Sequence, residues 1–192
     1  RNSGCKEVGY DFFFDPLISV CGTVKDIVAG NEIPMSAGIH FPDEGYVMTD
    51  MALPALLHMF FSAEVFRFDR IFSQRNTLRI MIKAKDALGG KITKGGWIQK
   101  TLAREDRQKL FGGYEKAKAI LKNAGARNIY KTWYLAAHPG GTVKIGELLN
   151  SNLETPYRQL YVCDCSVIPE AWGLPPTMTI ICLAKRLAKH LA

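Results

Sequence analysis

The C-terminal part of the chain constrains the fold most, because it joins an apolar strand pattern to a helix. Residues 159–164 (QLYVCD) have the pattern of a short strand buried on both faces. Pro175 and Pro176 then open a helix predicted over residues 177–191, where apolar side chains recur every three or four positions. Such a strand needs neighbours, and no earlier run is an obvious parallel partner. The sequence therefore predicts a closing strand and helix that complete a parallel sheet built by other residues.

The first half of the chain carries several strand patterns. Residues 17–24 are β-rich and mostly apolar, and residues 36–41 and 46–51 flank a Pro-Asp-Glu-Gly turn, which predicts a hairpin. Residues 77–85 alternate apolar and polar side chains, which predicts a half-buried strand. A hairpin connection over residues 86–91 is expected to join it to a short partner strand.

Two helices are expected in the same part of the chain. A short one over residues 53–61 is opened by Pro54, and the clearest one spans residues 101–124. Thr101 is the expected N-cap of the longer helix and Gly125 its stop. The predicted fold class is therefore α+β: a mainly antiparallel sheet with a long helix, followed by the closing strand and helix.

The composition limits the classes of function. The chain is 47% hydrophobic and 22% charged, which is typical of a globular protein. The net charge is +7, but lysine and arginine are spread along the chain without a basic stripe, so a nucleic-acid partner is not expected. No apolar run approaches the roughly 20 residues of a membrane span.

The cysteines favour free thiols in a reducing, cytoplasmic compartment. There are five, with no Cys-x-x-Cys pair. Cys163 and Cys165 alternate in a strand-like run, so their side chains would share one face, and a metal or redox site there is a weaker alternative. Metal analysis of the purified chain would decide between the two.

His138 begins the motif His-Pro-Gly-Gly-Thr, which is an unusual turn. Imidazole titrates near neutral pH and can take a proton from an alcohol, while the two glycines allow the backbone to approach a ligand closely. The alternative is a histidine that only hydrogen-bonds the turn. Taken alone, the motif leaves both interpretations open.

A second motif starts at Asp164, where the predicted strand ends in small and polar residues. A loop with Trp172 and Gly173 leads to Pro175-Pro176 and the last helix, whose N-terminal N–H groups suit an anion or an electron-rich ligand atom. An ordinary capped helix is the alternative.

Together the two motifs resemble the C-terminal end of the glucose-methanol-choline (GMC) oxidoreductases, most closely the cholesterol-oxidase-like branch. The resemblance covers residues 133–191, and residues 9–20, with Asp15-Pro16, are consistent with the family's start of the substrate domain. It implies a substrate-binding domain in residues 1–135, while residues 136–192 complete an FAD-binding domain.

The resemblance also implies a reaction and a set of site residues. The family is FAD-dependent and oxidises the CH–OH group of small-molecule alcohols, with hydride transfer to flavin N5 and His138 as the base. Asp164 and Cys165, with the backbone of Ser166, match the segment along the flavin's ribityl and phosphate chain. Pro176, Thr177 and Met178 match the segment under the flavin's pyrimidine end, where a helix dipole would stabilise the reduced ring.

Two features depart from the family. Pro175 stands where the family has a second polar residue, Asn or His, so its hydrogen bond to the substrate oxygen is lost or supplied elsewhere. In addition, no glycine belongs to a G-x-G-x-x-G fingerprint. We therefore expect the chain to be the C-terminal part of a longer enzyme, or a subunit whose N-terminal FAD-binding half is another chain. The start at Arg1 without a Met indicates either processing or a piece of a longer chain.

By itself the chain is expected to have little or no activity and to self-associate through the unpaired strand. A different class of function also fits the two departures. The chain could be a non-catalytic binding or assembly module that kept the fold after losing the cofactor domain. Stable behaviour as a flavin-free monomer would favour that alternative.

Overall fold

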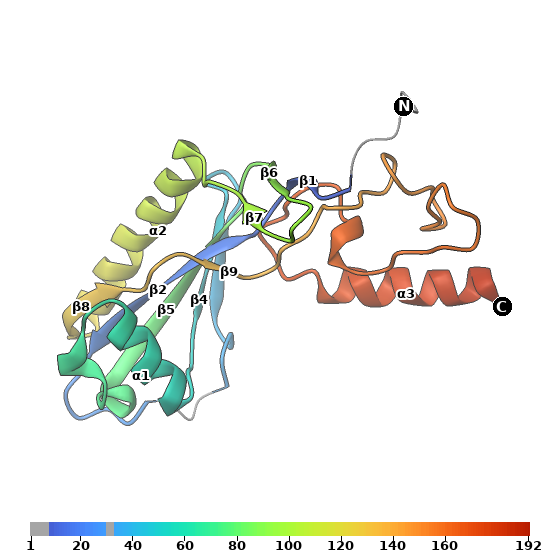
Figure 1. Ribbon diagram of the computed structural model, residues 1–192. Helices are drawn as coiled ribbons and strands as arrows, with labels where there is room; N and C mark the ends of the chain where they lie inside the picture. The colour runs from blue at the N-terminus through green and yellow to red at the C-terminus, as the bar shows by residue number, and fades with distance from the viewer. Residues whose placement is uncertain (1–7, 30–32) are drawn as a thin grey trace. The chain divides into compact units, whose positions relative to one another are not determined.

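The computed structural model describes residues 8–29 and 33–192, and the start of the chain at Arg1 lies outside this range. The chain forms two compact units, each assembled from separated segments (Figure 1). One contains Pro16–Ala84 and Arg104–Leu135, and is called the sheet unit here. The other contains the described residues up to Asp15, together with Lys85–Ala103 and Ala136–Ala192, and is called the loop unit.

The sheet unit is built on an antiparallel sheet. Among the described residues its strands follow the order β3-β4-β5-β2-β8, and β9 (Leu135–Ala136) also pairs with β2. The expected strands and hairpin are confirmed. Their bounds are β2 (Pro16–Thr23), β3 (Gly38–Phe41), β4 (Tyr46–Asp50) and β5 (Thr77–Ala84), and β8 (Arg127–Lys131) is a further strand that was not expected.

Both faces of β5 are covered, so the expectation of a half-buried strand is wrong. Helix α2 (Arg104–Asn123) packs on one face, where a Cβ added to Gly113 would lie 2.6 Å from Ile82. On the other face Arg79 donates a hydrogen bond of 2.8 Å to His58 of helix α1 (Ala55–Glu64). Both Arg79 and Lys83 are buried, although the sequence pattern assigns them to a solvent-facing side.

The helices of the sheet unit follow the sequence signals closely. Pro54 is the N-cap of α1, as expected, and two short 3-10 helices, η1 (Phe68–Arg70) and η2 (Gln74–Asn76), lead to β5. Helix α2 begins at Arg104, so Thr101 is not its N-cap. Its stop is confirmed: Gly125 has a left-handed φ of 78°, a conformation that glycine adopts without strain.

The loop unit contains a small sheet in the order β1-β6-β7. Its strands are β1 (Tyr10–Phe12), β6 (Gly89–Ile92) and β7 (Ile98–Gln99). β6 pairs with β1 and β7, so the expected hairpin between β5 and the strand after it is wrong. A turn signal indicates where a chain reverses, but it does not determine which strand becomes the partner.

The last helix is confirmed with the expected bounds, but the strand before it is not formed. Helix α3 spans Thr177–Leu191, and its Ile180, Leu183 and Leu187 pack against buried clusters of the loop unit. Residues 159–164 form a single bridge, between Tyr161 and Glu154, rather than a strand in a sheet. An extended segment needs neighbouring strands for its backbone groups, and the described chain supplies none in parallel.

The fold class is therefore confirmed as α+β with antiparallel sheets and a long helix. The domain division into residues 1–135 and 136–192 stays a prediction.

Candidate active site

The His138 loop is held by backbone hydrogen bonds to the segment that follows β1. Phe13 N–H donates to Gly140 O at 3.0 Å, and Gly140 N–H donates back to Phe13 O at 3.1 Å. His138 N–H donates to Phe14 O at 3.1 Å. A short ladder of backbone hydrogen bonds therefore holds the residue that carries the imidazole. The side chain of His138 is 29% exposed.

The Asp15 carboxylate faces the His138 imidazole. The distance from Asp15 Oδ2 to His138 Nδ1 is 3.6 Å, and the Asp15 side chain is only 2% exposed. The other carboxylate oxygen, Oδ1, accepts a hydrogen bond of 3.3 Å from Gly173 N–H. The site thus combines a partly exposed imidazole with a buried carboxylate on its Nδ1 side.

A buried ion pair fixes the backbone that presents Asp15. Asp86 accepts hydrogen bonds from the backbone N–H groups of Phe14 and Asp15, the latter at 2.9 Å. Lys100 Nζ lies 2.9 Å from Asp86 Oδ2 and also donates to the carbonyl of Phe12 at 2.6 Å. Asp15 has a positive φ of 48°, a conformation that Asp and Asn tolerate better than most residues.

The two sequence motifs meet at the glycines after His138. Gly141 N–H donates to Cys165 O at 3.3 Å, and Val143 N–H donates to Ser166 O at 2.9 Å. A Cβ added to Gly140 would lie 2.5 Å from Cys165 O, which is closer than real Cβ contacts. The glycine at this position is therefore required by the close approach of the Asp164–Ser166 segment.

The Asp164 segment forms the short 3-10 helix η3 (Cys165–Val167). Asp164 caps it, because its Oδ1 accepts a hydrogen bond of 2.7 Å from Ser166 N–H. Burial, and after it the negative charges of Asp15 and Asp164, raise the pKa of the Cys165 thiol. This thiol therefore stays protonated near neutral pH and is not an activated nucleophile.

A cavity of about 300 Å³ is bordered by both motifs. Its polar side is formed by the Asp164–Ser166 segment, and its apolar side includes the edge-to-face pair Phe12 and Phe14, whose ring centroids are 5.3 Å apart. The full lining is Phe12, Phe14, Ile92, Ile98, Pro139, Gly140, Thr142, Asp164, Cys165 and Ser166. Its volume is at the lower end of ligand pockets, so it suits part of a large ligand or a small one.

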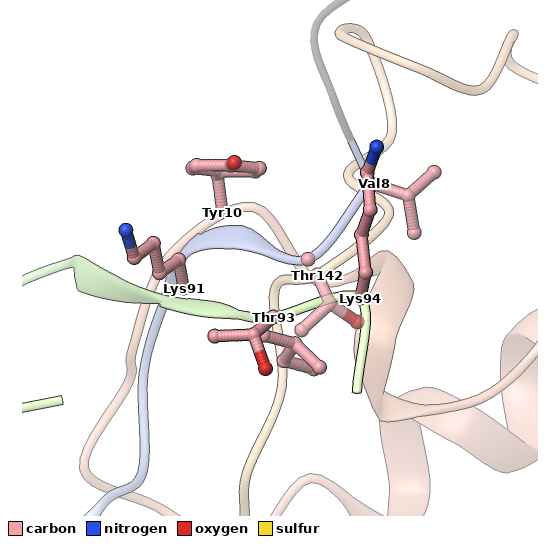
Figure 2. Close-up of a pocket in the computed structure, with 8 residues that line it drawn as sticks. Val8, Tyr10, Lys91, Thr93, Lys94 and Thr142 are labelled. Carbon is pink, nitrogen blue, oxygen red and sulfur yellow. The ribbon is translucent and has the colours of Figure 1, made fainter. Parts of the chain in front are cut away.

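A larger pocket of about 560 Å³ lies between β1, β6 and Thr142. Figure 2 shows that the ammonium group of Lys94 points towards Val8, whereas that of Lys91 points away from it. Because the two charges do not converge, this pocket does not form a defined anion site.

The first residues of α3, unlike the Asp164 segment, do not line the cavity beside the His138 loop. Pro176 is the N-cap and has no side-chain capping bond, and the side chain of Met178 is 71% exposed. Pro176, Thr177 and Met178 border neither of the two pockets. Asp164 and Cys165 thus border the cavity beside the His138 loop, whereas these three residues do not line it.

The described cysteines Cys21, Cys163, Cys165 and Cys182 are free thiols. Within residues 8–29 and 33–192 no three His, Cys, Asp or Glu side chains gather as a metal-binding group, and this includes the surroundings of Cys163 and Cys165. None of the helices in the described ranges is both long and apolar enough to cross a bilayer.

Sequence reasoning missed Asp15, Asp86 and Lys100. Asp15-Pro16 has the pattern of a turn, because a carboxylate next to proline is a common turn signal. The available signal was a single acidic residue directly after three phenylalanines, since a charge in such an apolar setting is usually paired.

Comparisons with known proteins identify the family of the chain. The C-terminal model of the GMC oxidoreductase family matches residues 67–184. This covers more than half of the chain, and the chain belongs to the GMC oxidoreductase family.

Two curated relatives extend the comparison. An uncharacterized protein of Methanocaldococcus jannaschii is 27% identical over 186 residues, which are 97% of this chain and 47% of the relative. A long-chain-alcohol oxidase of Arabidopsis thaliana is 31% identical over 85 residues, which are 38% of this chain and 11% of the relative. The chain thus spans about half the length of the first relative.

Proposed function

We propose that this chain is the substrate-binding and closing part of an FAD-dependent oxidoreductase that acts on CH–OH groups. The observation that carries the proposal is the His138 imidazole, partly exposed and backed by a buried carboxylate, in a loop joined to the Asp164 segment. Membership of the GMC family and the similarity to a relative named as an alcohol oxidase support the same reaction class.

FAD fits the residues present, but only in part. Two features of this chain suit a flavin: the cavity between Gly140 and the Asp164–Ser166 segment, and the exposed start of the 15-residue helix α3. In the proposal, Asp164 and Cys165 border the flavin's ribityl and phosphate chain. Pro176 sets the first turn of α3, from which Thr177 and Met178 offer backbone N–H groups to the flavin's pyrimidine end.

His138 would act as the proton acceptor for the substrate hydroxyl. FAD supplies the hydride acceptor for the carbinol carbon when it is bound. The imidazole is a suitable base near neutral pH, and its partly exposed position allows a substrate oxygen to reach it. Phe12, Phe14 and Ile98 give the nearby cavity an apolar wall, so we propose an apolar alcohol and the cholesterol-oxidase-like branch of the family.

The remaining half of the FAD site would come from an N-terminal FAD-binding part, in the same polypeptide or in a separate subunit. This chain spans 47% of the length of the M. jannaschii relative, and residues 159–164 have the strand pattern without a sheet. Without that half, the same segment would promote self-association. A cytoplasmic location belongs to the proposal, because the described cysteines are free thiols.

The proposal is tested on the complete protein, purified with the N-terminal half and FAD. Absorbance near ~450 nm that is retained after desalting would report the bound flavin. A series of primary and secondary alcohols of increasing chain length is then added without oxygen. We expect apolar alcohols to bleach the flavin band. A stable protein that binds no flavin would overturn the proposal and favour the non-catalytic binding or assembly module.

A further inference from the structure

We infer that Asp15 is the positioning residue of His138, in a site where Pro175 offers no polar side chain. The inference rests on the proposed function, because it assigns a partner to the base of the same site. Pro175 has neither a side-chain donor nor an acceptor, so it cannot orient the imidazole or the substrate oxygen. The carboxylate of Asp15 lies against the imidazole instead.

The contact fixes which nitrogen of the ring carries the proton. Asp15 Oδ2 is 3.6 Å from His138 Nδ1, which is an electrostatic contact rather than a hydrogen bond. A protonated Nδ1 is attracted by the carboxylate, whereas a lone pair at that position is repelled. The neutral ring therefore carries its proton on Nδ1 and leaves Nε2 as the acceptor for a substrate proton. The imidazolium formed by that transfer is stabilised by the same carboxylate.

The carboxylate is not needed to hold the turn in which it lies. Asp86 already accepts hydrogen bonds from the backbone N–H groups of Phe14 and Asp15, and Lys100 pairs with Asp86. Asp15 has a positive φ, and both Asp and Asn tolerate that conformation. Of the two contacts described for the Asp15 carboxylate, one receives Gly173 N–H and the other places a negative charge beside a titratable ring.

The substitution Asp15→Asn tests the inference with little change in shape. The amide oxygen can keep the hydrogen bond from Gly173, and the amide nitrogen then presents an N–H to His138. This N–H donor favours the opposite tautomer of His138, in which Nε2 carries the proton. A protonated Nε2 has no lone pair to accept a proton from the substrate. Asp11→Asn is the matched control, because Asp11 is exposed and has a similar φ of 51°.

The kinetic arm uses the complete FAD-loaded protein. We expect Asp15→Asn to lower kcat by about 100-fold or more with a small change in KM, since a misplaced general base costs a factor of this order. We expect Asp15→Glu to recover part of the rate and Asp11→Asn to retain the wild-type rate. Wild-type kcat in Asp15→Asn would overturn the inference.

The spectroscopic arm separates the inference from the proposed function. The ¹⁵N chemical shifts of the His138 ring report the tautomer without any turnover, and an Asn substitution at His138 assigns the signal. We expect the Nδ1–H form in the wild-type protein and the Nε2–H form in Asp15→Asn. An Nε2–H ring in the wild-type protein would overturn the inference, even if alcohols are oxidised. Conversely, an Nδ1–H ring in a protein that oxidises no alcohol would contradict the proposed function alone.

Discussion

Lys100 Nζ lies 2.9 Å from the carboxylate of Asp86, and the two side chains are only 2% and 0% exposed. Asp86 also receives two backbone N–H groups of the segment that presents Asp15, so this ion pair is the support of the candidate active site.

Replacing Lys100 with Met is expected to destabilise the protein strongly, by about 3–5 kcal/mol, because it leaves the Asp86 carboxylate buried without its cation. Urea unfolding of the purified protein measures the loss. Lys118→Met is the matched control. Lys118 is 33% exposed and lies 3.4 Å from Glu115, and loss of such a surface pair costs about 1 kcal/mol or less. Equal losses in the two variants would contradict the assignment.

Two adjacent glycines of α2 should respond to alanine in opposite directions. A Cβ at Gly112 meets nothing within 4 Å, whereas one at Gly113 would lie 2.6 Å from Ile82 of β5. Gly112→Ala is expected to stabilise the protein by about 0.5–1 kcal/mol through helix propensity. Gly113→Ala is expected to destabilise it, because the helix must move away from the sheet. Thermal unfolding measures both, and the same sign for the two would show that α2 does not pack on β5 through Gly113.

The sheet unit should lose stability in mild acid because of His58. Its Nε2–H donates to Arg70 O at 2.8 Å and its Nδ1 accepts from Arg79 at 2.8 Å, an arrangement that requires a neutral ring. Burial, and further the positive charge of Arg79, lower the pKa of His58 below its ordinary value of 6.5.

The sign of the effect follows from proton binding. Below pH 6.5 the unfolded chain binds a proton at His58 that the folded protein does not bind. The free energy of unfolding therefore decreases as the pH is lowered, until the pH reaches the lower pKa of His58 in the folded protein. The limiting slope is about 1.4 kcal/mol per pH unit for one proton. The free energy of unfolding, measured between pH 7.5 and pH 5, should therefore depend less on pH in His58→Gln than in the wild-type protein. His40→Gln is the control, because His40 is exposed. An unchanged pH dependence in His58→Gln would rule out this linkage.

Local sequence signals predicted where helices and strands form better than they predicted which elements pack or pair with one another. The Pro175-Pro176 pair and the apolar spacing determine the bounds of α3, because both act within the helix itself. The burial of Arg79 could not be predicted in the same way, since it depends on α1 covering that face of β5.

The candidate site shows the same limit. The motif around His138 and the Asp164 segment were both recognised, and their close approach is consistent with the glycines between them. The contact between Asp15 and His138 joins residues far apart in sequence, and the pairing of β6 with β1 creates its setting. Neither follows from local patterns, because a turn residue and a buried partner look alike until the tertiary fold is known.

The most direct test of the account is the rate at which an apolar alcohol reduces the flavin of the complete protein when His138 is replaced by Asn. Rapid mixing without oxygen measures this step alone, and the flavin band before mixing confirms that the cofactor is bound. If His138 is the base, flavin reduction slows by about 100-fold or more while alcohol binding is largely retained. Reduction at the wild-type rate in His138→Asn would contradict the account.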